Sequence, residues 1–302
     1  MFIRYRKIEI AGPCNFNCRV CGYPKSITNI PTTEDILAAM EGIPQQSNVE
    51  FIGGEPFLRK DMNVIIKAAS ERFKRVKLTT NGSAFYYESK LWKALDAGLK
   101  NIEVKFFSVI PEIHNYITRT NTFEYAAKGI DNISRFLDKS PDLLYDYNWD
   151  NIFVAGRVIA STRSLPSLED TVKHLSTKGF ARIIIDLSHA DSFSPSVIET
   201  VRGSIKAAIA NSVWTLTVGL PLCLMSGIEE HCGEIYRLDK TIPGYAAVSG
   251  ACDICVLADE CAGVPAGFAG ANNLKPITNL DHSGKLRDVV SLRNCARWNR
   301  DC

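Results

Sequence analysis

The stretch KIEIAGPCNFNCRVC, residues 7–21, joins a short apolar segment directly to three cysteines. Charged and apolar residues alternate through KIEIAG at 7–12, which predicts a β-strand. Cys14, Cys18 and Cys21 follow with the spacing C-x3-C-x2-C. The three thiols therefore share the loop that leaves the first predicted strand, and the fold around that strand decides what chemistry they can support.

Strand and helix signals alternate from this stretch to about residue 212. Runs of β-branched and aromatic residues predict further strands at 49–54, 75–82, 101–108, 151–160 and 182–190. Amphipathic segments between them predict helices at 61–73, 89–98 and 167–179, the last with Ser167 as N-cap and Gly179 as C-cap. Alternation of this kind is typical of the α/β class with a parallel sheet.

Six such units fit a partial barrel or an open, doubly wound sheet, and in both folds the chemistry lies at the carboxyl ends of the strands. The cysteine loop is therefore expected at the active face. After about residue 212 the alternation stops, and one strand candidate, WTLTV at 214–218, precedes irregular chain rich in cysteine and glycine. A metal cluster could organise such a segment. We expect two domains, residues 1–212 and residues 213–302.

The composition narrows the class of protein. The 302 residues carry a net charge of +2 and no strong basic patch, so no nucleic-acid partner is indicated. The N-terminus lacks the continuous apolar run of a signal peptide, and no run approaches the length that crosses a bilayer. We therefore predict a cytoplasmic protein without a membrane partner. In that compartment, ten cysteines indicate metal binding or catalysis rather than disulfides.

The first cysteine group offers three thiolates and no nearby histidine, whereas a structural zinc site usually has four protein ligands. Three ligands on an iron–sulfur cube leave one iron open for a substrate or cofactor. The alternative at this group is zinc. A second group could likewise hold either an iron–sulfur cluster or zinc; it consists of Cys223, Cys232, Cys252, Cys255 and Cys261. Two further cysteines, Cys295 and Cys302, lie near the C-terminus.

Four motifs in order resemble the radical S-adenosylmethionine (SAM) family over roughly residues 5–210. They are the C-x3-C-x2-C loop, GGEP at 53–56 after the second strand, TTNGS at 79–83 after the third, and the segment at 111–130 after the fourth. The resemblance implies a partial (β/α)6 barrel. It also implies that Cys14, Cys18 and Cys21 hold a 4Fe–4S cluster whose fourth iron chelates SAM.

The resemblance further implies that cleavage of SAM yields a 5′-deoxyadenosyl radical, with electrons from an external donor such as flavodoxin or ferredoxin. Glu55 is expected to accept a hydrogen bond from the ammonium group of SAM, and two adjacent glycines are expected to let the backbone approach the ligand. The expected cofactor-binding residues are Gly53, Gly54, Glu55, Pro56, Thr80 and Asn81.

The spacing C-x2-C-x5-C at 252–261 resembles the auxiliary-cluster domains known as SPASM and Twitch. A full SPASM pattern has a further cysteine where this chain has Pro265, so we expect a single auxiliary 4Fe–4S cluster. The preferred ligands are Cys223, Cys252, Cys255 and Cys261, which leaves Cys232 free. Zinc stays open here as well.

The substrate is predicted to be a small polar metabolite, of the sugar or aminoglycoside kind. A free thiol at Cys232 could return a hydrogen atom to a carbon radical, which favours epimerisation; the alternative for this residue is a buried small hydrophobe. Three other functions stay open: dehydrogenation through the auxiliary cluster, maturation of a ribosomal peptide, and a non-enzymatic zinc-stabilised binding module. The chain begins at its first predicted strand, which weighs against a leader-peptide domain. Lys105, Arg157 and Asp186 face either the barrel interior or the outside.

Overall fold

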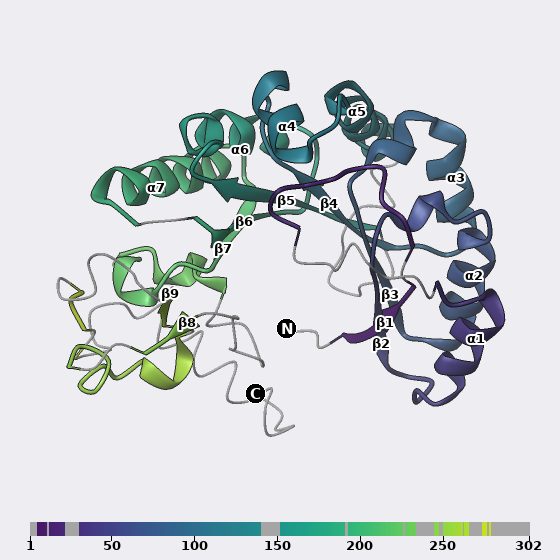
Figure 1. Ribbon diagram of the computed structural model, residues 1–302, viewed down its shortest axis with the longest axis horizontal. Coiled ribbons are helices and arrows are strands. Elements are labelled where there is room, and N and C mark those ends of the chain that lie inside the picture. The colour runs from purple at the N-terminus through teal and green to yellow at the C-terminus, as the bar shows by residue number, and fades with distance from the viewer. Residues whose placement is uncertain are drawn as a thin grey trace.

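The computed structural model describes residues 5–10, 12–21, 30–139, 152–190, 193–225, 227–233, 245–247, 250–261, 263–265, 274–276 and 278. Its main element is a seven-stranded sheet in which every neighbouring pair is parallel and the strands follow one another in chain order (Figure 1). The strands are β1 (Arg6–Glu9), β2 (Asn48–Ile52), β3 (Arg75–Thr80), β4 (Asn101–Phe106), β5 (Phe153–Ser161), β6 (Arg182–His189) and β7 (Trp214–Val218). The predicted α/β partial barrel is confirmed.

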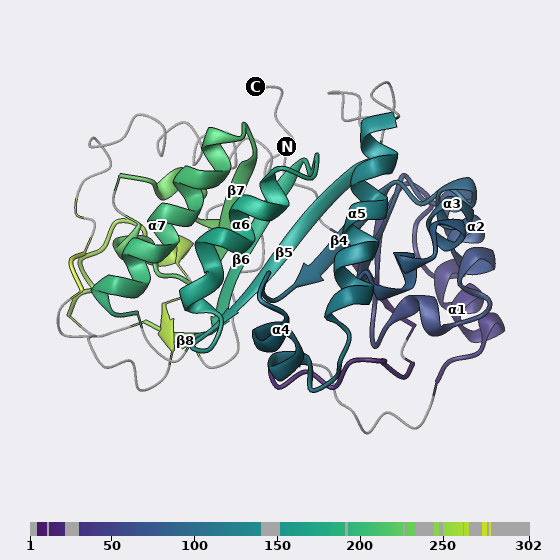
Figure 2. The ribbon, with the colours of Figure 1, turned by 90° about the horizontal axis from the view of Figure 1, so that it is seen from above.

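Helices follow most of the strands and cover the outer face of the curved sheet (Figures 1 and 2). They are α1 (Thr33–Glu41), α2 (Met62–Arg72), α3 (Glu88–Asp96), α4 (Pro111–Thr118), α5 (Phe123–Lys139), α6 (Leu168–Ser176) and α7 (Pro195–Ala210). The segments predicted at 61–73, 89–98 and 167–179 correspond to α2, α3 and α6. Thus each crossover places a helix over the outer face, as parallel sheets require.

Alternation along the strands gives the sheet two different faces. In β2, Val49 and Phe51 are fully buried toward the helices, and Glu50 between them points to the concave side. In β4, Val104 is buried in the same outer core, while Glu103 points inward. The apolar layer stabilises the helix–sheet interface, and the inward positions are left for polar groups.

The seventh strand lies just beyond residue 212, where the sequence predicts the first domain to end. WTLTV forms β7 and pairs with β6 from Arg182↔Trp214 to Asp186↔Val218, so the sheet continues past residue 212 to Val218. Beyond it, the described chain has short 3-10 turns and one two-residue antiparallel pair, β8 (Tyr245–Ala246) and β9 (Val264–Pro265). None of the helices in the described ranges combines the length and the hydrophobicity that a bilayer crossing needs.

The capping prediction for α6 holds only in part. Ser167 precedes the helix, but its hydroxyl donates to the carbonyl of Ser164 at 3.0 Å and makes no capping bond. Thr177, not Gly179, is the C-cap residue. Gly179 has φ +72°, a conformation that favours glycine, and it turns the chain two residues later.

Candidate functional site

Three loops meet at the carboxyl ends of β1, β2 and β3. The backbone N–H of Glu55, in the loop after β2, donates to the carbonyl of Pro13 at 3.2 Å. Gly54 lies so close to the first loop that a Cβ atom there would collide with the carbonyl oxygen of Gly12, and its φ is +20°. Glycine is therefore required where GGEP touches the cysteine loop.

The carboxylate of Glu55 joins the second loop to the third. It is buried and accepts hydrogen bonds from the Thr80 hydroxyl at 2.7 Å, the Asn81 N–H at 2.8 Å and the Phe57 N–H at 3.2 Å. Burial raises the pKa of this carboxyl, and the three hydrogen bonds act in the opposite direction. In this structure Glu55 therefore organises the loops. Its predicted contact with the SAM ammonium group stays a prediction.

Asn81 connects the third loop to the cysteine loop. Its side-chain amide donates to the Asn15 carbonyl oxygen at 2.9 Å and lies 3.8 Å from the Cys14 sulfur. Asn15 in turn donates to the Ser83 hydroxyl at 2.9 Å. Thus the residues predicted from GGEP and TTNGS surround the cysteine loop rather than lying on separate parts of the sheet.

The three cysteines of the first group lie together at this edge. Cys14 and Cys21 are exposed and Cys18 is half-buried. Burial, followed by the neighbouring thiols of Cys14 and Cys21, raises the pKa of Cys18 to about 12. Burial also raises the pKa of Cys14. Thiolates so close together need a positive partner, and a bound metal cluster supplies one.

Helix α4 holds the cysteine loop from the other side. The N–H groups of Asn17 and Arg19 donate to the carbonyls of Thr118 and Ile117, both at 2.9 Å. Beneath the loop, the ring of Phe16 meets the ring of His114 edge-on, with centroids 6.0 Å apart. The loop is thereby fixed by backbone bonds as well as by packing.

His114 is a residue whose setting the sequence did not reveal. It is fully buried, and Phe106, Phe107 and Phe123 also contact its ring. Burial lowers its pKa to about 4. It is therefore a neutral part of the floor under the cysteine loop, and a sequence pattern with one histidine among scattered phenylalanines gives no sign of this.

A chain of alternating charges crosses the concave face of the sheet. Lys77 bonds to Glu50 at 2.9 Å and to Glu103 at 2.8 Å. Arg157 bonds to Glu103 and, at 2.9 Å, to Asp186. Burial opposes ionisation of Glu103, yet Arg157 and Lys77 hold its pKa well below the ordinary value. Arg157 and Asp186, which the sequence left facing either side of the sheet, thus face the barrel interior.

Lys105 lies on the same inward face as Glu103, two residues along β4. It is close enough to Cys18 and Glu55 to lower the pKa of each, although burial raises both. Its ammonium group is therefore near both the cysteine loop and the GGEP loop.

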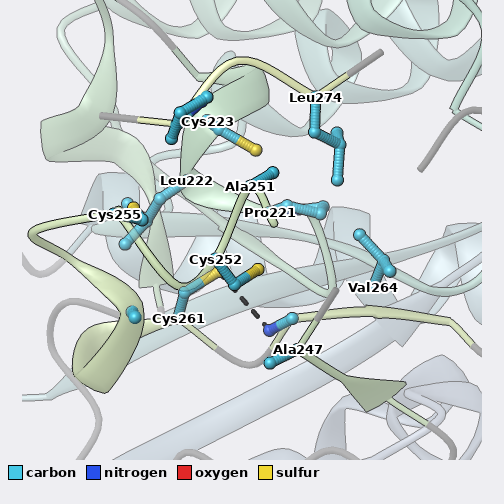
Figure 3. A pocket seen from close by; sticks show the side chains of 13 residues that line it. Pro221, Leu222, Cys223, Ala247, Ala251, Cys252, Cys255, Cys261, Val264 and Leu274 are labelled. Carbon is cyan, nitrogen blue, oxygen red and sulfur yellow. Dashed lines mark hydrogen bonds between the residues drawn. The ribbon is translucent and has the colours of Figure 1, made fainter. Parts of the chain in front are cut away.

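Four cysteines of the second group line one pocket (Figure 3). They are the four preferred ligands, Cys223, Cys252, Cys255 and Cys261. Burial, then the neighbouring thiols of Cys261, Cys255 and Cys252, raises the pKa of Cys223 to about 12. Apolar residues such as Leu222, Val264 and Leu274 complete the lining. Across the described ranges, no three His, Cys, Asp or Glu side chains converge tightly enough to hold a single metal ion.

Cys232 lies apart from this pocket. It is fully buried, its sulfur is 3.6 Å from the carbonyl oxygen of Leu220, and its backbone bridges to Thr217 in β7. A hydrogen donor to a bound substrate needs an accessible thiol, so this position gives the predicted donor role no support. Cys295 and Cys302 lie outside the described residues.

Part of the chain is similar in sequence to known proteins. Residues 8–152 match the Radical SAM superfamily model. GTP 3',8-cyclase of Shewanella denitrificans is 34% identical over 136 residues, which are 42% of this chain and 40% of that enzyme. The probable GTP 3',8-cyclase of Methanocaldococcus jannaschii is 34% identical over 134 residues, 42% of this chain and 44% of that protein. The chain thus spans less than half the length of these curated relatives.

Solved structures resemble the fold at low identity. Streptococcus suis SuiB bound to its precursor peptide SuiA matches with a TM-score of 0.55 and 12% identity, over 76% of this chain and 51% of SuiB. The SAM-bound structure of SuiB matches with a TM-score of 0.53 and 13% identity, over 78% of this chain and 55% of that one. At such identities the likeness concerns the fold alone.

Proposed function

We propose that this chain, whose residues 8–152 match the Radical SAM superfamily model, is an enzyme that cleaves SAM to start radical chemistry on a small polar metabolite. One observation carries the proposal: the loop with Cys14, Cys18 and Cys21 is bonded to the GGEP loop through Pro13 and to the third loop through Asn81. Three thiols and the GGEP backbone are thereby gathered at one edge of the sheet.

The residues fit a 4Fe–4S cluster with SAM. When bound, these groups supply a 5′-deoxyadenosyl radical that removes a hydrogen atom from an unactivated carbon. Cys14, Cys18 and Cys21 would hold the cluster and leave one iron without a protein ligand. Gly53 and Gly54 both have positive φ angles, and the missing side chain of Gly54 lets the GGEP backbone lie against the cysteine loop that would hold the cluster. Glu55, Thr80 and Asn81 fix the position of that backbone, and Pro56 begins the turn that follows it.

We also propose an auxiliary 4Fe–4S cluster in the pocket of Cys223, Cys252, Cys255 and Cys261. Zinc is the competing occupant. A single zinc ion needs four sulfurs at about 2.3 Å from one centre, whereas a cube binds each thiolate at a separate iron. The four thiols line one pocket, which supplies the four thiolates that a closed cube needs.

The charge of the concave face bears on the substrate. Lys77 and Arg157 are each engaged by two carboxylates, so the described face offers these cations to the substrate only at the cost of breaking ion pairs. The charged chain and Lys105 thus bring three negative and three positive side chains to the described face: the carboxylates of Glu50, Glu103 and Asp186, and the cations of Lys77, Arg157 and Lys105. A balanced surface of this kind suits a neutral or cationic polar molecule such as a sugar or an aminoglycoside.

A guanosine nucleotide is the second candidate, because the similar curated proteins are named GTP 3',8-cyclases. It would need positive charge for its phosphates, and Lys105 is placed to supply part of that charge. Epimerisation, dehydrogenation through the auxiliary cluster and peptide maturation all stay predictions. Epimerisation through Cys232 is disfavoured by the burial of its thiol.

Anaerobic reconstitution with iron and sulfide tests the proposal. The reduced wild-type protein should convert SAM to 5′-deoxyadenosine, and a variant with Cys14, Cys18 and Cys21 replaced by alanine should not. A matched variant with Cys252, Cys255 and Cys261 replaced by alanine should still form 5′-deoxyadenosine without substrate. Equal SAM cleavage by the first variant and the wild type would show the proposal to be wrong. Binding of GTP and of aminoglycosides, measured on the same preparation, separates the two substrate classes.

A further inference from the structure

Three polar side chains form a closed ring of hydrogen bonds beside Cys14. The Asn81 amide donates to the side-chain oxygen of Asn15 at 2.9 Å, and the Asn15 amide donates to the Ser83 hydroxyl at 2.9 Å. The Ser83 hydroxyl then donates to the side-chain oxygen of Asn81 at 2.7 Å, which closes the ring. The three donors thus run in one direction, and the ring joins the cysteine loop to the loop after β3.

The ring fixes which end of the Asn81 amide faces Cys14. The amide oxygen accepts two bonds from Ser83, one from the hydroxyl and one from the backbone N–H at 3.0 Å. If the amide were turned over, its NH2 group would face that backbone N–H, and two donors would meet. The NH2 group is therefore held on the side of the cysteine loop.

The Asn81 amide has a donor to spare for the cysteine. An amide NH2 group donates two hydrogen bonds, and Asn15 takes one of them. The second N–H is left for the Cys14 sulfur, 3.8 Å from the nitrogen, a distance that the large radius of sulfur allows. The backbone N–H of Phe16 donates to the same sulfur at 3.4 Å. Asn81 and Ser83 are buried, so water competes little with this arrangement.

We propose that Asn81 raises the reduction potential of the cluster on the first cysteine group by donating this hydrogen bond to the Cys14 thiolate. The inference rests on the proposed function, because it needs a cluster on Cys14. A cluster that takes up an electron gains negative charge, so a donor to a ligand sulfur stabilises the reduced state more than the oxidised one. Ser83 and Asn15 orient the donor, and the three act as positioning residues because none is a proposed cluster ligand.

The side chain of Asn81 can be changed while the loop keeps its other bonds. The backbone N–H of Asn81 donates to the Glu55 carboxylate at 2.8 Å, and a side-chain substitution leaves that donor in place. Asn81→Asp also keeps the shape and the oxygen that accepts both bonds from Ser83, but it loses the N–H groups that face Asn15 and Cys14. This variant therefore separates a donor role from a role in shaping the loop.

The test is a potentiometric titration of the reconstituted full chain without SAM, followed by electron paramagnetic resonance. The signal to follow is the one lost when Cys14, Cys18 and Cys21 are replaced by alanine. At a fixed potential, Asn81→Asp should lower the ratio of reduced to oxidised cluster about tenfold, which is about 59 mV for a one-electron couple. Asn81→Leu, which removes the donor and adds no charge, should lower it about fivefold. Ser83→Ala should lower it about threefold, because the amide is then less strictly oriented.

Asn121→Asp is the matched control for the added charge. Asn121 is exposed in the segment that follows α4, the helix that holds the other side of the cysteine loop. The substitution introduces the same charge at a position outside the ring, so the ratio should stay as in wild type.

The outcomes distinguish the inference from the function on which it rests. A wild-type ratio in Asn81→Leu would overturn the inference whatever Asn81→Asp shows, because added charge alone would then move the potential. A fall in Asn121→Asp equal to that in Asn81→Asp would overturn it for the same reason. A wild-type ratio in Ser83→Ala would contradict the orienting role of the ring. If no cluster signal depended on the first cysteine group, the proposed function itself would be refuted.

Discussion

The two cysteine groups differ in how much of the surrounding fold holds them in place. The first lies in a loop that backbone and side-chain bonds tie to α4 and to the loops after β2 and β3. The second lies in a segment whose described parts have 3-10 turns and a pair of two-residue strands. The barrel fold therefore positions the first three thiols, whereas the proposed auxiliary cluster would have to organise the second four.

Removing the second group should have the largest effect on structure. With Cys252, Cys255 and Cys261 replaced by alanine, we expect a loss of about four irons and rapid proteolysis beyond Val218, because metal binding supplies the folding free energy there. The barrel should stay intact. Iron and sulfide assays with mass spectrometry of limited digests measure this.

The matched variant replaces Cys14, Cys18 and Cys21 instead. It should also lose about four irons but remain as resistant to protease as wild type, because the barrel holds its loop. If both triple-alanine variants were equally sensitive to protease, the barrel would not hold the first cysteine loop more firmly than the second group.

Gly54→Ala tests the close approach of the first two loops. A side chain there would meet the Gly12 carbonyl, so we expect the free energy of unfolding to fall by about 2–4 kcal/mol and SAM binding to be lost. Denaturant titration and equilibrium dialysis give the two values. The control is Gly42→Ala at the end of α1, where the nearest atom would be 3.8 Å away and little should change. A stable Gly54→Ala protein that binds SAM would contradict the proposed contact.

His114, which lies beneath the first cysteine group, should make the free energy of unfolding fall at acidic pH. Its pKa is about 6.5 when unfolded and about 4 in the folded protein, so the unfolded state takes up the proton first as the pH falls. The resulting loss of stability begins below about pH 6.5, is complete below about pH 4, and amounts to roughly 3 kcal/mol.

The measurement is the difference in unfolding free energy between wild type and His114→Phe across this pH range. This difference in unfolding free energy should change by roughly 3 kcal/mol between about pH 6.5 and pH 4. The contributions of the other titrating groups cancel because both proteins contain them. A difference that does not vary with pH would show that His114 is not the buried neutral base described.

Cys232→Ala should have the smallest effect. The thiol is buried but lies outside the pocket of the other four cysteines, so we expect a loss of about 1 kcal/mol in stability and no loss of iron. Iron content and a thermal melt measure this. Loss of about four irons would make Cys232 a cluster ligand, and loss of an inverted product alone would restore its role as hydrogen donor.

Much of the fold could be predicted from the sequence because its signals are local. Most strands of the sheet are short segments rich in β-branched residues, and β3 ends at Thr80, within two residues of the predicted 82. The place of β7 could not be predicted, because its pairing with β6 is a contact between distant parts of the chain. The helix α1 was missed, although Thr32 and Asp35 form a capping box before it.

In the candidate site, too, some features follow from local sequence motifs and others depend on three-dimensional packing. The positions of Cys14, Glu55 and Asn81 on successive loops follow from motif order, because the carboxyl ends of parallel strands meet at one edge. The hydrogen bonds that engage Glu55, the burial of Cys232 and the phenylalanine setting of His114 depend on three-dimensional packing. No periodicity or spacing in the sequence carries that information.

The response of each cysteine group to SAM tests the difference between them most directly. The two triple-alanine variants, reconstituted and reduced, each keep one group, and electron paramagnetic resonance reports their clusters with and without SAM. We expect SAM to change the spectrum only in the variant that keeps Cys14, Cys18 and Cys21, and only that variant to form 5′-deoxyadenosine. A spectrum that SAM changes in the variant keeping only the second group, or 5′-deoxyadenosine formed there, would contradict the assignment of SAM chemistry to the first.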